Sequence, residues 1–231
     1  MSERGNKPKT GDAMATDLYN LLKKTGHQGP YILVGHSMAG ITLRSFVDKY
    51  PNEVAGVVFV DARHPLHSKR AALDSVLKRQ PYTPPSYWST HLKSELGYTR
   101  FMLNFSKLAY PSTTPTESIN VIARAFVPMS EPAENEEIRA LEFMSDHAAH
   151  LKNFGNIPLT VITKANKKNR EDPSFGAKGN AYIKLWMDLQ KEHLKLSTNS
   201  KHILATNSGH YVQLNEPQVV IDAVRELTSK Y

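Results

Sequence analysis

Four short apolar runs recur along the chain, and each has the length of a buried strand. They cover residues 31–34, 54–60, 159–163 and 201–206. Apolar positions spaced three or four residues apart indicate helices at 12–24, at 41–50 and at 217–230. The pattern therefore predicts an α/β chain in which a helix follows the first strand and another follows the last.

The stretch between the strand ending near Asp61 and the strand starting at Leu159 reads mostly as helix. Its aromatic and methionine side chains supply apolar content, and its prolines predict breaks between successive helices. These prolines are Pro65, Pro81, Pro84, Pro85, Pro111, Pro115, Pro128 and Pro132.

A serine stands at the turn that follows the first of these strands. The sequence there is Gly35-His36-Ser37-Met38-Ala39-Gly40. A serine hydroxyl becomes a useful nucleophile only when a base reaches it, and a sharp strand-to-helix turn presents it to base and substrate together. Residues two before and two after the serine must be small in such a turn. Gly35 and Ala39 are small, so the segment predicts a nucleophile elbow.

A histidine follows the last strand, at the end of the run Asn207-Ser208-Gly209-His210, and a closing helix begins at Pro217. With the elbow, this strand, histidine loop and helix resemble the α/β-hydrolase fold family. The resemblance implies an α/β fold with a mostly parallel sheet flanked by helices. It also implies that Ser37 is the nucleophile and that His210 is the general base.

The carboxylate that should orient His210 has two candidates. In this family the acid lies between serine and histidine along the chain. The loop after residues 159–163, where the family most often carries its acid, has no carboxylate until Glu171 and Asp172. Asp61 ends the strand 54–60 and begins a stretch that resembles a recurring one in such hydrolases. We therefore expect Asp61 to be the acid, with Asp172 as the alternative.

The resemblance begins part-way through the family's fold. Residues 4–8 are similar to the family's loop after its fourth strand, and no earlier strand or His-Gly oxyanion loop precedes them. We therefore expect a fold that is N-terminally truncated relative to the family. The amide of Met38 supplies one oxyanion donor. A second donor has no source in the sequence, and loss of one donor costs about a hundred- to a thousandfold in turnover, so weak activity is expected.

The resemblance also fixes the expected domain organisation. Residues 1–231 form a single α/β-hydrolase domain, with a core at 1–64 and 152–231 and a helical lid at 65–151. Some of the lid's aromatic and methionine side chains are expected to line an apolar pocket over Ser37.

Composition narrows the function classes. The 231 residues are 40% hydrophobic and 22% charged, with no cysteine and no membrane-spanning run, which predicts a cytoplasmic globular protein unless an N-terminal signal is missing. The net charge of +7 is scattered along the chain and includes one basic loop at 164–170, so we expect no nucleic-acid partner.

The oligomeric state is left open. No cofactor is implied, and the histidine groups around His64 and His147 lack a third ligand, so no metal is expected.

These features predict a serine hydrolase that cleaves an ester, thioester or amide of a small apolar molecule through an acyl-enzyme on Ser37. The alternative is a truncated or non-catalytic homologue that binds a small ligand or a protein. Acyl transfer and lyase chemistry use the same three residues, and the sequence does not distinguish them from hydrolysis or identify the substrate.

Overall fold

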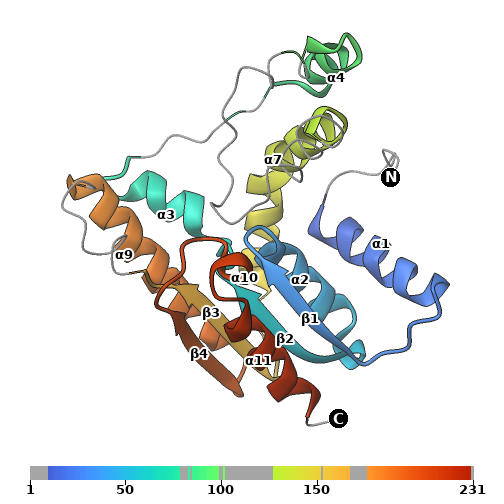
Figure 1. Ribbon diagram of the computed structural model, residues 1–231, viewed down its shortest axis with the longest axis vertical. Coiled ribbons are helices and arrows are strands. Elements are labelled where there is room, and N and C mark those ends of the chain that lie inside the picture. Colours follow the sequence, from blue (N-terminus) through green and yellow to red (C-terminus); the bar gives the residue numbers. More distant parts are fainter. Residues whose placement is uncertain are drawn as a thin grey trace. The chain divides into compact units, whose positions relative to one another are not determined.

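Four parallel strands form a sheet in the order β1-β2-β3-β4 (Figure 1). The computed structural model describes residues 10–78, 83, 85–98, 101, 127–151, 153–166 and 176–229. The strands are β1 (Tyr31–His36), β2 (Val54–Val60), β3 (Leu159–Lys164) and β4 (Ser200–Ala205). Each begins within one residue of its predicted position, and the α/β class with a parallel sheet is confirmed.

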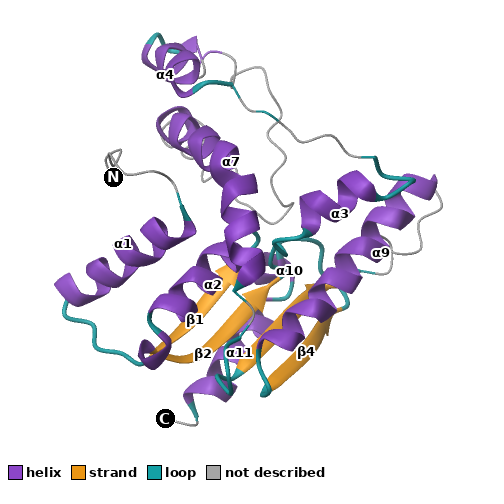
Figure 2. Cartoon of the chain, turned by 180° about the vertical axis from the view of Figure 1, so that it is seen from behind, coloured by secondary structure: helices purple, strands orange, loops and turns teal. Residues whose placement is uncertain are grey.

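Helices cover both faces of the sheet. Figure 2 shows α2 and α9 on one face, and α11 lies against the other. The α-helices are α1 (Gly11–Lys24), α2 (Ala39–Lys49), α3 (His67–Leu73), α4 (Tyr87–Glu95), α7 (Val127–His150), α9 (Gly176–His193), α10 (Val212–Asn215) and α11 (Pro217–Thr228), with 3-10 turns at Pro51–Glu53 and Leu194–Leu196.

Strand β2 is buried along its whole length because each face of the sheet carries its own apolar layer. Val57 and Phe59 pack with α1 and α2, whereas Val58 and Val60 pack with α10 and α11. This two-sided burial explains why the strand is an unbroken apolar run rather than an alternating one. The end of β2, at Asp61, is consequently enclosed on both sides.

The chain divides into two compact units. One comprises residues 10–81 and 143–231 and contains the sheet, and residues 82–142 belong to the other. Within the second unit, Asn135 donates from Nδ2 to Thr90 Oγ1 over 3.0 Å, which ties α7 to α4. The predicted lid, 65–151, includes this unit, and its role as a lid stays a prediction.

Helix α2 begins in close contact with the chain that leaves β2. A Cβ atom added at Gly40 would lie 2.8 Å from both the Ala62 Cβ and the Arg63 carbonyl oxygen. Contacts that short do not occur between real Cβ atoms and backbone, so the residue at this position has to lack a side chain. Gly40 therefore sets the distance between the elbow helix and the segment after β2.

We predict that Gly40→Ala lowers the free energy of unfolding by about 1–3 kcal/mol, because the added methyl overpacks against fixed backbone. Urea unfolding followed by circular dichroism measures it. Asp48→Ala, at the exposed end of the same helix, is the matched control and should change the value by less than about 0.5 kcal/mol. Equal stability of the two variants would contradict this packing account.

Candidate active site

Ser37 occupies the turn between β1 and α2 with a left-handed backbone, at φ 55°. A non-glycine residue in this region is strained by about 1–2 kcal/mol, and such strain concentrates at functional sites. The carbonyl of Ser37 accepts hydrogen bonds from the amides of Arg63, at 2.7 Å, and of Gly40, at 3.1 Å. These two bonds hold the turn in place.

The small residues around Ser37 are required by packing. A Cβ atom at Gly35 would lie 2.6 Å from Leu43 Cδ1 and 3.0 Å from the Cβ of Ala39. The elbow geometry predicted from Gly35 and Ala39 is therefore present, and the methyl group of Ala39 is accommodated because Gly35 has none.

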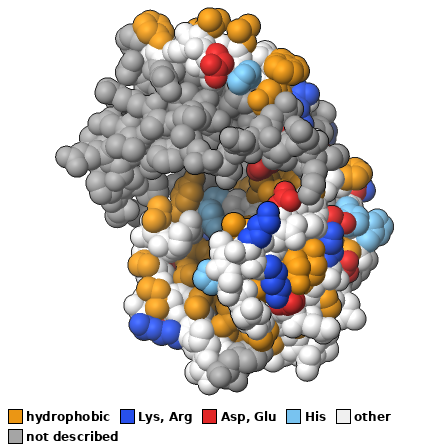
Figure 3. Space-filling view, turned by 90° about the vertical axis from the view of Figure 1, so that its right-hand side faces the viewer, with side chains coloured by type: hydrophobic (Ala, Val, Ile, Leu, Met, Phe, Trp, Pro, Cys, Tyr) orange, Lys and Arg blue, Asp and Glu red, His pale blue; other side chains and the backbone are white. Residues whose placement is uncertain are grey.

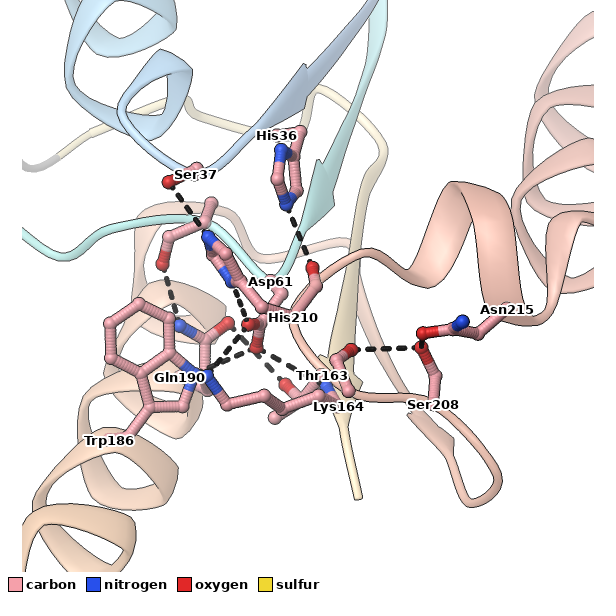
Figure 4. Close-up of polar contacts among 12 residues, drawn as sticks. His36, Ser37, Asp61, Thr163, Lys164, Trp186, Gln190, Ser208, His210 and Asn215 are labelled. Atoms are coloured by element: carbon pink, nitrogen blue, oxygen red, sulfur yellow. Dashed lines mark hydrogen bonds and ion pairs between the residues drawn. The ribbon is translucent and has the colours of Figure 1, made fainter. Parts of the chain in front are cut away.

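His210 lies in the loop between β4 and α10, and its ring spans Ser37 and Asp61 (Figure 4). Its Nε2 is 3.0 Å from the Ser37 Oγ, and its Nδ1 is 2.6 Å from the Asp61 Oδ2. An ionised carboxylate only accepts hydrogen bonds, so Nδ1 carries the proton and Nε2 is left to accept from the hydroxyl. The imidazole is thus oriented to take a proton from Ser37.

The loop that carries His210 is fixed by its backbone. His36 Nε2 donates to the carbonyl oxygen of His210 over 2.8 Å, and the two imidazole rings lie 4.5 Å apart. On the other side, the buried Ser208 donates to the carbonyl of Gly209 over 2.8 Å, and the amide of Asn207 donates to Glu216 over 2.9 Å. His36, which directly precedes Ser37, therefore helps to position His210, although Ser37 and His210 are 173 residues apart in the sequence.

Asp61 is fully buried at the end of β2. Its Oδ1 accepts from the indole Nε1 of Trp186 at 2.7 Å and from the amide of Lys164 at 3.3 Å. Its Oδ2 faces His210 and the ammonium of Lys164, which is 3.1 Å away. Burial raises the pKa of Asp61, but the bond from His210, the charge of Lys164 and the bond from Trp186 together outweigh it and hold the pKa below its usual value. The carboxylate is therefore ionised.

The structure brings together the three residues that the sequence singled out, Ser37, His210 and Asp61. Met38 stands next to Ser37 as the N-cap residue of α2, and its role as an oxyanion donor stays a prediction. Asp172, the alternative acid, lies outside the described residues.

Comparison with known proteins finds a matching family model, curated relatives and similar solved structures. Residues 2–99 match the model of a family described as the alpha/beta hydrolase fold. An AB hydrolase superfamily protein of Gibberella zeae is 26% identical, over 95% of this chain and 71% of its own length. The chain covers only 33% and 65% of two further curated relatives.

Two solved structures are similar over nearly the whole chain. A probable hydrolytic enzyme from Pseudomonas aeruginosa matches with a TM-score of 0.60 and 16% identity, over 98% of this chain and 72% of that one. A thermophilic esterase from Thermogutta terrifontis matches with a TM-score of 0.51 and 20% identity, over 100% of this chain and 75% of that one. This chain has the α/β-hydrolase fold.

In this α/β-hydrolase fold, one face of α9 holds the end of β2. Trp186 binds the Asp61 side chain, Gln190 Nε2 donates to the carbonyl of Ala62 over 2.6 Å, and His193 Nε2 lies 3.3 Å from the same oxygen. These residues stand at positions i, i+4 and i+7, so they share one helix face. Sequence reasoning missed all three. Their helical spacing was visible, but nothing local showed that this face meets Asp61 rather than an apolar core.

A buried cation lies behind this contact. The Arg44 guanidinium donates through Nη2 to His193 Nδ1 over 3.0 Å and through Nη1 to the carbonyl of Leu151 over 3.1 Å. Burial lowers the pKa of Arg44 to about 10. Burial, with the nearby Arg44, also holds the pKa of His193 well below its ordinary value, so its ring is neutral and Nδ1 can accept.

His64 belongs to the same buried cluster. Its ring lies 4.9 Å from that of His193, and its Nδ1 accepts from the amide of Leu66 over 3.1 Å. Burial, with the positive charges of Arg44 and Arg70, lowers the pKa of His64 to about 3. The chain leaving β2 is therefore held by neutral histidines next to a guanidinium.

A small hollow of about 30 Å³ lies next to Lys164 and Trp186, two residues that contact Asp61, on the α9 side of Lys164. It is lined by Lys164, Ala165, Asn166, Tyr182, Ile183, Trp186 and Met187. The charged side chains on the face shown in Figure 3 are intermixed, with acidic groups next to basic ones.

Among the residues that the structure describes, no three histidine, aspartate or glutamate side chains are grouped so that they would hold a metal ion. In the same residues, no helix combines the length and the apolarity needed to cross a membrane.

We predict that the protein loses stability as the pH falls below about 6.5, where an unfolded histidine binds a proton. In the folded protein the pKa of His64 is about 3, so His64 stays unprotonated at the pH where an unfolded histidine binds a proton. The unfolded chain therefore gains a proton that the folded chain does not. At pH 5.5 this single histidine should cost about 1.4 kcal/mol. Urea unfolding at pH 7.5 and 5.5 measures the loss.

In His64→Gln the loss of stability between the two pH values should be smaller by about that amount. His27→Gln, which removes an exposed histidine, is the control and should reproduce the loss seen in the unaltered protein. If His64→Gln loses as much stability as the control, the buried His64 is not the source of the pH dependence.

Proposed function

We propose that this protein is a serine hydrolase that cleaves an ester, thioester or amide of a small apolar molecule through an acyl-enzyme on Ser37. The observation that carries the proposal is the unbroken hydrogen-bonded series from Ser37 Oγ through His210 to the buried Asp61 carboxylate, at 3.0 and 2.6 Å. These distances are within the range that proton transfer requires.

In the proposed reaction the Ser37 Oγ attacks the substrate's carbonyl carbon while His210 Nε2 takes the hydroxyl proton. The carbonyl π electrons move onto oxygen, and the Met38 amide donates to that oxyanion. Collapse of the tetrahedral intermediate breaks the bond to the leaving group, which receives the proton from His210. Water, activated by the same imidazole, then attacks the acyl-enzyme and restores Ser37.

Asp61 has two roles in this scheme. It keeps the proton of the neutral imidazole on Nδ1, and it stabilises the positive charge that His210 acquires when Nε2 is protonated. A buried carboxylate is costly unless donors surround it, and Asp61 has donors from β3, α9 and the His210 loop. These donors keep the carboxylate ionised, which both of its proposed roles require.

The small hollow beside Trp186 has mostly apolar walls, which supports an apolar group in the substrate. Its walls include one tyrosine, one tryptophan and one methionine next to the proposed site. Ligand sites are commonly apolar with a few polar groups that set orientation. The AB hydrolase superfamily protein of Gibberella zeae, the probable hydrolytic enzyme of Pseudomonas aeruginosa and the esterase of Thermogutta terrifontis support hydrolysis as the reaction.

We predict that a fluorophosphonate, which reacts with activated serines, adds once to the unaltered protein and does not add to Ser37→Ala. Intact-mass spectrometry reads out the adduct. Ser229→Ala, which removes an exposed serine far along the chain, should keep it. Labelling of Ser37→Ala would remove Ser37 from the mechanism, and a folded protein that is never labelled would favour a binding role.

We predict that Asp61→Asn slows this labelling by roughly a thousandfold or more, because the amide no longer holds the required tautomer or balances the imidazolium charge. The rate of adduct formation by mass spectrometry measures it. Asp172→Asn should label at the unaltered rate. The opposite result, with only Asp172→Asn impaired, would make Asp172 the acid.

A further inference from the structure

Two positively polarised groups share one oxygen of Asp61. The Lys164 ammonium is 3.1 Å from Oδ2, and His210 Nδ1 is 2.6 Å from the same atom. Figure 4 shows Lys164 approaching the carboxylate from β3, whereas His210 comes from the loop after β4. The carboxylate that faces the proposed base is therefore already paired with a full positive charge.

Lys164 is held in this position by contacts at both ends. Its backbone lies at the end of β3, in register with Ala205, and its amide binds the other oxygen of Asp61. Its ammonium lies 4.3 Å from the centre of the Trp186 ring, a cation–π distance, and the indole of Trp186 donates to Asp61 as well. Lysine, tryptophan and carboxylate thus form a closed set of contacts.

The remaining titratable groups around His210 are weaker candidates for setting its charge. His36, from β1, lies 4.5 Å from the His210 ring, and burial holds the pKa of His36 below its ordinary value, so it is neutral. Tyr211 lies 5.5 Å away and is an aromatic neighbour. Among the described side chains facing the His210–Asp61 pair, Lys164 carries the fixed positive charge.

We propose that Lys164 is a positioning residue for the proposed reaction: through the shared oxygen of Asp61 it opposes protonation of His210 and extends Ser37 reactivity to lower pH. The inference rests on the proposed roles of Ser37 and His210. A positive charge beside the carboxylate weakens the carboxylate's pull on a second positive charge. Unprotonated His210 is the form that accepts the Ser37 proton, so the ammonium keeps the site competent in mildly acidic solution.

The test compares how the rate of fluorophosphonate labelling at Ser37 depends on pH in three variants. Lys164→Met removes the charge and keeps much of the side chain's length, whereas Lys164→Arg keeps the charge. Lys201→Met, on the neighbouring strand β4, removes one lysine whose ammonium pairs with Glu226 rather than Asp61. Circular dichroism confirms the fold of each, and Lys164→Gln replaces Lys164→Met if that variant unfolds.

We expect the half-maximal pH of labelling to rise by roughly half to one pH unit in Lys164→Met. At pH 5.5 its rate, relative to its own plateau, should fall about three- to tenfold below that of the unaltered protein. Lys164→Arg and Lys201→Met should retain the original profile.

An unchanged profile in Lys164→Met would overturn the inference while leaving the proposed function intact. An equal loss of rate at every pH, without displacement of the profile, would also overturn it, because it would give Lys164 a packing role only. Failure of the unaltered protein to label would defeat the proposed function itself, and this inference with it.

Discussion

The buried carboxylate of Asp61 is the constraint on which the rest of the site depends. A charge removed from water is tolerated only when donors replace the lost hydration. Asp61 obtains them from the end of β3, from the middle of α9 and from the loop after β4. Satisfying this one group therefore requires three segments, widely separated along the chain, to meet at the end of β2.

A second set of buried polar residues holds the backbone at the end of β2 in place. Gln190 and His193 hold the backbone next to Asp61, and Arg44 holds His193. Arg44 also binds the carbonyl of Leu151, so α2 is joined to α9 and to the chain that leads into β3. Each of these buried polar side chains is satisfied by a specific hydrogen-bond partner, and a different arrangement of the strand ends would separate the partners.

Sequence reasoning located the strands, the elbow, Ser37 and His210 because each has a local signature. Asp61 was preferred to Asp172 because the sequence after residue 163 has no carboxylate before Glu171, and the structure places Asp61 in contact with His210. Trp186 and Asp61 are 125 residues apart, and no pattern within α9 shows which strand end it meets. Lys164 counted only as the start of a basic loop, because pairing with a buried carboxylate leaves no mark in the sequence.

The all-parallel strand order has a consequence for how this site comes into existence. Every strand pair in the sheet is non-local, and Ser37 and His210 are separated by 173 residues. Such pairings form slowly, because a long loop has to close before any contact compensates for its lost entropy. A chain in which β1, β2 and β3 have already paired would hold Ser37 and Asp61 in place but would lack His210, the proposed base, between them. The proposed reactivity of Ser37 would then arise only when β4 docks and brings His210 into place. Reaction at Ser37 would therefore indicate that the sheet is complete.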